Sequence, residues 1–204
     1  MCKVVVIGAG ASGMIAAIRA SKNNEVVLLE KNDKCGKKIL LTGNGKCNYW
    51  NSDINIDKYH TDSFLELKEI LRNKDEVLDF LDNLGIYPKI KNGYYYPNSN
   101  QASSIREILC KELCKRNVNI VYNCQADKIE KNNDKFIIHT NVDNFICDKV
   151  IIALGSSSAP KTGTSGDGYK ILEDIHTINP VLPSLVPLVG NGNFFKEWNN
   201  IIFT

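Results

Sequence analysis

Residues 3–30 have the sequence KVVVIGAGASGMIAAIRASKNNEVVLLE, and this stretch decides the fold. It opens with an apolar β-branched run at Lys3–Ile7, continues with an amphipathic segment at Met14–Ala20, and closes with a second apolar run at Val26–Leu29. Apolar runs of this length are typical of buried strands, and the apolar spacing between them is typical of a helix. The stretch therefore predicts a strand–helix–strand unit whose two strands lie in one parallel sheet.

Three glycines follow the first strand at the spacing G-x-G-x-x-G. Gly8 allows a tight turn, Gly10 lets the backbone approach a pyrophosphate because it has no Cβ, and Gly13 permits close packing of helix on strand. The helix N-terminus offers free N–H groups and a partial positive charge to phosphates. Glu30 follows the second strand, where a carboxylate can accept hydrogen bonds from both ribose hydroxyls. The unit predicts a dinucleotide site; the alternative is a plain crossover that binds no ligand.

The glycine motif alone does not decide between NAD and FAD. Gly36 follows Glu30 at the sixth position, a spacing seen where the first βαβ unit binds a flavin dinucleotide. A later apolar run, VIIALG at residues 150–155, ends in Ala-x-Gly and resembles the strand end common in flavoproteins with two dinucleotide sites. Together these two features favour FAD.

Length and composition limit the class of protein. A chain of 204 residues is long enough for one domain with a substantial core, and its net charge of +2 gives no basic surface of the kind that binds nucleic acid or an anionic membrane. No stretch approaches the roughly 20 apolar residues of a membrane span. The chain enters its first strand directly after Met1 and Cys2, which leaves no room for a secretory signal. We therefore expect a cytoplasmic protein whose seven cysteines are thiols.

The rest of the chain predicts further helices, a β-meander and a returning strand. Apolar periodicity indicates one helix over residues 63–84 and another that starts at Ser104. Turn residues divide residues 126–148 into three short strands, the run at 150–154 returns to the sheet, and a last helix covers about 166–174. This order predicts an α/β protein: a Rossmann-like three-layer fold with a parallel sheet, helices and a small β-meander.

Four blocks of sequence carry a resemblance to a known family. They are GAGASGMIAAIRA (8–20) with VVLLEKN (26–32), CGKKILLTGNGKCN (35–48), GYYYPNSNQASSI (93–105), and VIIALGSSSAPKTGTSGDGY (150–169) followed by PVLPSLVPL (180–188). In this order they resemble the FAD-dependent flavoproteins that include BaiN, RdsA and the aminoacetone oxidases, a family with a glutathione-reductase-like FAD fold. The second and fourth blocks are long, so this match is more specific than the glycine motif.

The resemblance implies that FAD binds in an extended form. Ser12 and Gly13 would contact the pyrophosphate, and Glu30 the adenosine ribose. The cofactor-binding residues that the resemblance implies are Gly8, Gly10, Ser12, Gly13, Glu30, Lys31, Gly36, Lys37, Thr42, Gly43, Asn44, Ala126 and Gly155. In this arrangement the segment at 42–44 would run along the cofactor toward the flavin, and Ala126 would present its backbone to the adenine.

The chain departs from the family pattern at three positions and in length, and one of these positions is Ile175, which stands before His176 where a Gly-His pair is usual. Family members usually have a second glycine where this chain has Ser156, and an arginine where it has Lys46, which cannot make a bidentate contact. The family continues for about as many residues again, with an inserted domain and a segment that closes the flavin site. We therefore expect a truncated chain: an incomplete FAD/NAD(P)-binding Rossmann-like domain at 1–188, the start of the inserted domain at 189–204, and a missing C-terminal half as its partner.

The cysteines provide no catalytic pair in this interpretation. A redox disulfide of the glutathione reductase type needs a close C-x-x-x-x-C pair, whereas Cys35 and Cys47 lie twelve residues apart. Cys110 and Cys114 share one helix face and are expected to pack in the core, because no histidine lies at metal-ligand spacing from them. The sequence therefore predicts no metal site and identifies no catalytic residue.

The resemblance implies an FAD-dependent oxidoreductase. A reduced nicotinamide cofactor, NAD(P)H, or an organic substrate would give hydride to the flavin, and the reduced flavin would pass electrons to a small molecule such as an enone, or to oxygen. Two alternatives stay open: an NAD(P)-binding Rossmann dehydrogenase, and a non-catalytic truncated remnant that binds a nucleotide. The absence of a second half with its own glycine turn argues against the dehydrogenase.

Overall fold

A four-stranded parallel sheet forms the centre of the computed structural model, which describes residues 1–59, 61–158, 160–173 and 175–181. Its strands lie in the order β10 (Lys149–Ile152), β1 (Lys3–Ile7), β2 (Glu25–Leu29) and β6 (Asn119–Val121). All three neighbouring pairs are parallel. This pairing confirms the strand–helix–strand unit predicted for residues 3–30.

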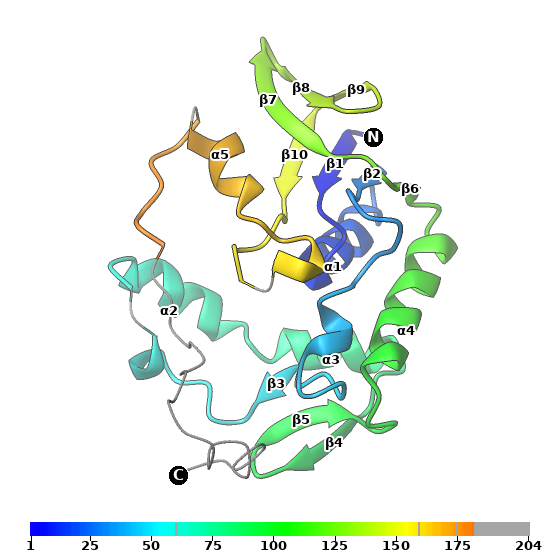
Figure 1. The fold of residues 1–204 in the computed structure, drawn as a ribbon. Helices are drawn as coiled ribbons and strands as arrows, with labels where there is room; N and C mark the ends of the chain where they lie inside the picture. The colour runs from blue at the N-terminus through cyan, green and yellow to red at the C-terminus, as the bar shows by residue number, and fades with distance from the viewer. Residues whose placement is uncertain (60, 159, 174, 182–204) are drawn as a thin grey trace, which may run out of the picture.

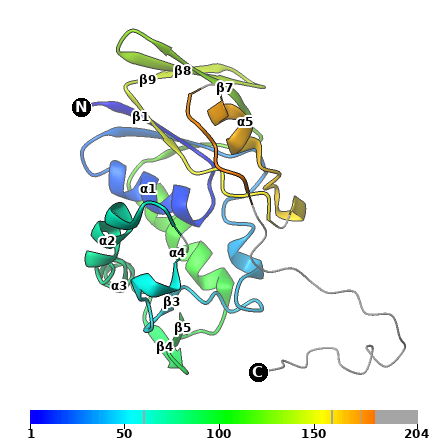
Figure 2. The same ribbon diagram turned by 90° about the vertical axis from the view of Figure 1, so that its left-hand side faces the viewer.

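Helices cover one face of the sheet and the β-meander covers the other (Figures 1 and 2). The first face carries α1 (Ala11–Ala20) and α4 (Ala102–Lys115); the second carries β7 (Ala126–Asn132), β8 (Lys135–Thr140), β9 (Asn144–Cys147) and α5 (Asp167–Glu173). Val4 and Val6 belong to the core on the helical side, whereas Val5 and Ile7 belong to the core under the meander. Because successive side chains of a strand point to opposite faces, β1 contributes to both cores. The three-layer α/β fold is thus confirmed.

The segment between β2 and α4 forms a smaller region beside the helical face (Figure 1). Three short strands pair antiparallel in the order β3 (Trp50–Asn51), β5 (Tyr94–Pro97) and β4 (Pro88–Lys91), and α2 (Phe64–Arg72) and α3 (Glu76–Asn83) lie between β3 and β4 in the chain. The single-turn helices are η1 (Ile39–Leu41), η2 (Ile56–Lys58) and η3 (Pro160–Thr162). Leu81 joins the core on the helical side, so α3 packs close to α1 and α4.

Three helix boundaries differ from the sequence prediction. The helix predicted over 63–84 is two helices, because Asn73 leaves helical geometry with φ −103° and ψ 18°, and α3 starts after Asp75. Helix α1 starts at Ala11, three residues earlier than predicted. Helix α4 likewise starts two residues before Ser104, the predicted first position.

Two expectations about the chain ends lie outside the described residues: the domain boundary at residue 188 and the start of an inserted domain at 189–204. In the part of the chain that the structure describes, no helix is both long and apolar enough to cross a bilayer.

Candidate functional site

A cavity of about 480 Å³ opens at the carboxyl ends of β1, β2 and β10. Three chain segments line most of it: the glycine turn after β1, the loop that follows β2, and the loop that follows β10. Open α/β sheets bind ligands at this edge because the loops there leave a crevice outside the strand ends. The cavity therefore lies where residues 3–30 predict a dinucleotide.

The three motif glycines have two different roles in this turn. Gly8 has φ +99°, and a Cβ on it would lie 2.6 Å from the carbonyl oxygen of Ala153; a Cβ on Gly13 would lie 1.7 Å from the carbonyl oxygen of Gly8. Both are therefore required by packing of the protein on itself. Gly10 is different, because a Cβ there would meet nothing within 4 Å, although the residue lines the cavity.

Gly10 is also the N-cap of α1, and no side chain caps that helix end. The first-turn N–H groups of a helix have no intrahelical partner, and they attract anions together with the helix dipole. The open space over Gly10 is therefore a fit for a diphosphate that approaches the backbone closely. The open space over Gly10 and the uncapped end of α1 therefore fit a dinucleotide, and this evidence comes from the structure rather than from the sequence motif.

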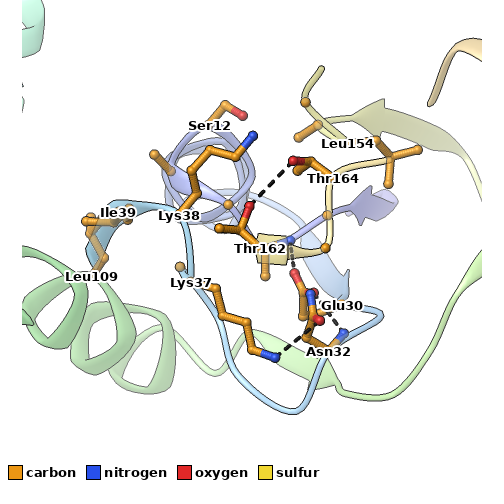
Figure 3. A pocket seen from close by; sticks show the side chains of 18 of the residues that line it. Ser12, Glu30, Asn32, Lys37, Lys38, Ile39, Leu109, Leu154, Thr162 and Thr164 are labelled. Atoms are coloured by element: carbon orange, nitrogen blue, oxygen red, sulfur yellow. Dashed lines mark hydrogen bonds between the residues drawn. The ribbon is translucent and has the colours of Figure 1, made fainter. Parts of the chain in front are cut away.

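Glu30 is 7% exposed and points back into the glycine turn. Its Oε2 accepts a hydrogen bond from the backbone N–H of Ala9 at 2.9 Å. Its Oε1 accepts from the backbone N–H of Asn32 at 2.9 Å and from Asn32 Nδ2 at 2.6 Å (Figure 3). Each carboxylate oxygen has two lone-pair positions, so Oε2 keeps one acceptor position for a ligand hydroxyl.

Lysines surround the same end of the cavity. Lys37 Nζ donates to Asn32 Oδ1 at 3.2 Å and pairs with Asp33 at 2.9 Å. Lys38 Nζ donates to the carbonyl oxygen of Ser158 at 2.9 Å, so it connects the loop after β2 to the loop after β10. Lys31 pairs with Asp167, and its hydrogen bond holds the pKa of that carboxyl below its ordinary value. Positive side chains at this end suit a phosphate ligand.

The other end of the cavity is apolar. Ile15 from α1, Ile39 from η1, Val77 and Leu81 from α3, and Leu109 from α4 line it. Figure 3 shows Ile39 and Leu109 together on one side, and Glu30 with Asn32 on the other. A cavity with an apolar wall and a few convergent polar groups is the usual form of a small-molecule site.

The structure brings ten of the thirteen predicted cofactor-binding residues to this cavity. These ten are Gly8, Gly10, Ser12, Glu30, Lys31, Gly36, Lys37, Thr42, Ala126 and Gly155. Gly13 supports the turn from behind through its contact with Gly8. Gly43 and Asn44 form an exposed turn, with φ +56° and +54°, and do not line the cavity.

Several lining residues were not anticipated from the sequence. Asn32 lies inside a quoted block, and its short distance in sequence from Glu30 is a signal that could have identified it. The apolar wall from α3 and α4 has no such signal, since its residues form ordinary amphipathic helix faces. Among the described residues, no group of three or more His, Cys, Asp or Glu could hold a metal ion.

Residues 2–182 match the family described as the HI0933-like protein Rossmann domain. The chain belongs to this family. The match covers the glycine turn, Glu30 and all three cavity-lining loops, so the resemblance carried by the four sequence blocks is confirmed.

Two relatives in this family have named activities. The chain is 36% identical over 194 residues to "3-dehydro-bile acid delta(4,6)-reductase" of Clostridium scindens, covering 92% of this chain and 47% of the relative. It is 29% identical over 197 residues to "Ribosomal RNA dihydrouridine synthase" of Escherichia coli, covering 95% of this chain and 49% of that protein. The chain therefore spans about half the length of these relatives.

A solved structure supports the fold assignment. The open conformation of a flavocytochrome c3 fumarate reductase superposes with a TM-score of 0.65 at 16% identity, over 85% of this chain and 40% of that one. At this identity the similarity shows a shared Rossmann-like architecture for the family domain.

Proposed function

We propose that this chain is the FAD-binding half of a flavin-dependent oxidoreductase. The observation that carries the proposal is the open space over Gly10, where the uncapped N-terminus of α1 meets the cavity beside the carboxylate of Glu30. This arrangement offers backbone donors to a diphosphate and an acceptor to a ribose hydroxyl. Membership of the HI0933-like family supports the same assignment.

Specific roles follow for the proposed cofactor residues. The N–H groups of the first turn, including Ser12, would hold the pyrophosphate, and Glu30 Oε2 would accept from the adenosine ribose. Gly36 and Lys37 would lie beside the adenosine half, and Ala126, which also lines the cavity, would present its backbone to the adenine. Thr42 would lie along the path toward the flavin, and Gly155 would pass close to the pyrophosphate. When bound, FAD supplies hydride transfer, and the protein supplies position and electrostatics.

The substrate class is proposed from the chemistry that the two relatives' names share. A delta(4,6)-reductase and a dihydrouridine synthase both reduce carbon–carbon double bonds, in a bile acid and in a ribosomal RNA base respectively. We propose reduction of an activated double bond in a small organic molecule, with NAD(P)H as the hydride donor. A net charge of +2 gives no electrostatic support for an RNA substrate. The other half of the relatives' length would complete the substrate site.

Absorption spectroscopy of the purified chain tests the cofactor. Titration with FAD should give bound flavin with visible bands, and Gly10→Ala should weaken binding while the fold is retained. Binding of ADP-ribose without FAD would favour the NAD(P)-binding or non-catalytic alternative. Bleaching of the bound flavin by NADH or NADPH tests the donor, and unchanged flavin absorbance with both would refute it.

A further inference from the structure

The side-chain amide of Asn32 connects two charged residues of the loop that follows β2. Its Nδ2 donates to Glu30 Oε1 at 2.6 Å, and its Oδ1 accepts from Lys37 Nζ at 3.2 Å (Figure 3). A carboxylate only accepts hydrogen bonds and an ammonium only donates them, so the amide has one orientation that satisfies both neighbours. An aspartate of the same size would lack the donor that Glu30 requires.

The main chain of Asn32 is held at both of its polar groups. Its N–H donates to Glu30 Oε1 at 2.9 Å, and its carbonyl oxygen accepts from the backbone N–H of Asn123 at 3.1 Å. Asn123 follows β6, the strand that pairs with β2. The backbone therefore fixes the point from which the amide reaches Glu30 and Lys37.

The loop after β10 packs against the same amide. A Cβ on Gly163 would lie 2.6 Å from Asn32 Nδ2 and 3.0 Å from Asn32 Oδ1. Gly163 also has φ +91°, a conformation that glycine adopts without strain. Because this residue has no side chain, the loop backbone can approach the amide closely and limit its movement. Gly163 and Asn32 both line the cavity, so this contact belongs to the site.

Asn32 occupies one oxygen of Glu30 and leaves the other available. Both of its N–H donors go to Oε1, which fills the two lone-pair positions of that oxygen. Oε2 accepts from Ala9 N–H and keeps its second position for a ligand hydroxyl. The bonds from Asn32 therefore determine which oxygen of the carboxylate is free for a ligand.

Lys37 already directs two of its three ammonium donors at the protein. Its Nζ pairs with Asp33 Oδ1 at 2.9 Å, and it donates to the Asn32 amide at 3.2 Å. The carboxylate of Asp33 also opposes the lysine charge. Both features favour a role through Asn32 over direct contact with a phosphate.

We propose that Asn32 is a positioning residue for the adenosine ribose and that Lys37 acts through it. Lys37 orients the amide, the amide holds Oε1 of Glu30, and Oε2 then accepts from the ribose at a fixed place. This inference rests on the proposed function, because it needs an adenosine ribose beside Glu30. It gives Lys37 a part in ribose recognition rather than in phosphate binding.

Two nucleotides that differ only in the ribose test the proposal. ADP has both ribose hydroxyls and 2′,3′-dideoxy-ADP has neither, whereas adenine and diphosphate are the same. In calorimetry of the whole chain, the wild type should bind ADP about tenfold more tightly than the dideoxy nucleotide. In Asn32→Ala and in Lys37→Gln this ratio should fall toward one, because only ADP binding is weakened. Asn83→Ala, at an exposed position of α3, is the matched control and should keep the wild-type ratio.

The two ligands separate positioning from other roles. A substitution that only disorders the loop, or a lysine that contacts phosphate directly, would weaken both nucleotides equally, and that result would overturn the proposal. A wild-type ratio near one, or a ratio that both variants retain, would overturn it as well. If the wild type binds neither nucleotide, the proposed function fails and this inference fails with it. Should Asn32→Ala not fold, Lys37→Gln decides, because the Lys37 side chain is 36% exposed and its replacement leaves the core intact.

Discussion

Replacing Glu30 by Gln should destabilise the fold itself, before any ligand is considered. The carboxylate accepts three hydrogen bonds: Oε2 accepts from Ala9 N–H, and Oε1 accepts from the Asn32 backbone and side-chain amides. A glutamine has one carbonyl oxygen and one NH₂ group. In either orientation, its NH₂ must face at least one backbone N–H at a position that is 7% exposed.

The expected loss follows from the unpaired donor. A buried donor without a partner costs about 1–3 kcal/mol, and bonds to a charged acceptor lie at the upper end. We therefore expect Glu30→Gln to lower the free energy of unfolding by about 2–3 kcal/mol in urea denaturation, with an unchanged m-value. Glu66→Gln, on the exposed side of α2, is the control and should change stability by less than about 0.5 kcal/mol. If Glu30→Gln is as stable as the control, the carboxylate does not accept these bonds.

Three further substitutions test separate features. Gly13→Ala places a Cβ 1.7 Å from the Gly8 carbonyl oxygen and should cost about 2–3 kcal/mol in urea denaturation; a neutral result would contradict the close helix–strand packing. Gly10→Ala should change stability by less than about 1 kcal/mol yet weaken ADP-ribose binding about tenfold in calorimetry, and equal affinity would remove the turn from the site. Hydrogen bonds from Lys135 and a backbone amide lower the pKa of Asp148, so its contribution is present above the ordinary value of 3.8 and is lost as pH falls through the lower folded value. The stability difference between wild type and Asp148→Asn should therefore disappear in acid, and a difference that persists at pH 2 would count against the ion pair.

The parallel sheet and the glycine turn were predictable because both depend on short stretches of chain. Each strand is a compact apolar run, and Gly8 and Gly13 are required by contacts inside the same unit or with the adjacent strand. Local sterics and periodicity are sufficient there. The break at Asn73 was not predicted, because the apolar pattern continues across it and favours one long helix.

The apolar wall could not be predicted, because it depends on how distant elements pack. Leu81 and Leu109 have the same spacing as any core-facing helical residues, and only the tertiary fold places them at one cavity.

Strand β1 has an apolar side chain at all four positions from Val4 to Ile7, and both of its faces are covered. A one-residue slip would therefore exchange similar side chains between the two cores, so hydrophobic alternation specifies the alignment only weakly. Hydrogen bonds at the two ends of the strand help to specify its alignment. Lys3 N–H donates to Asp148 at 2.7 Å, and Gly8 N–H donates to the Leu29 carbonyl oxygen at 2.8 Å. Gly8, the first residue of the glycine turn, thus also helps to fix the register of the strand before it.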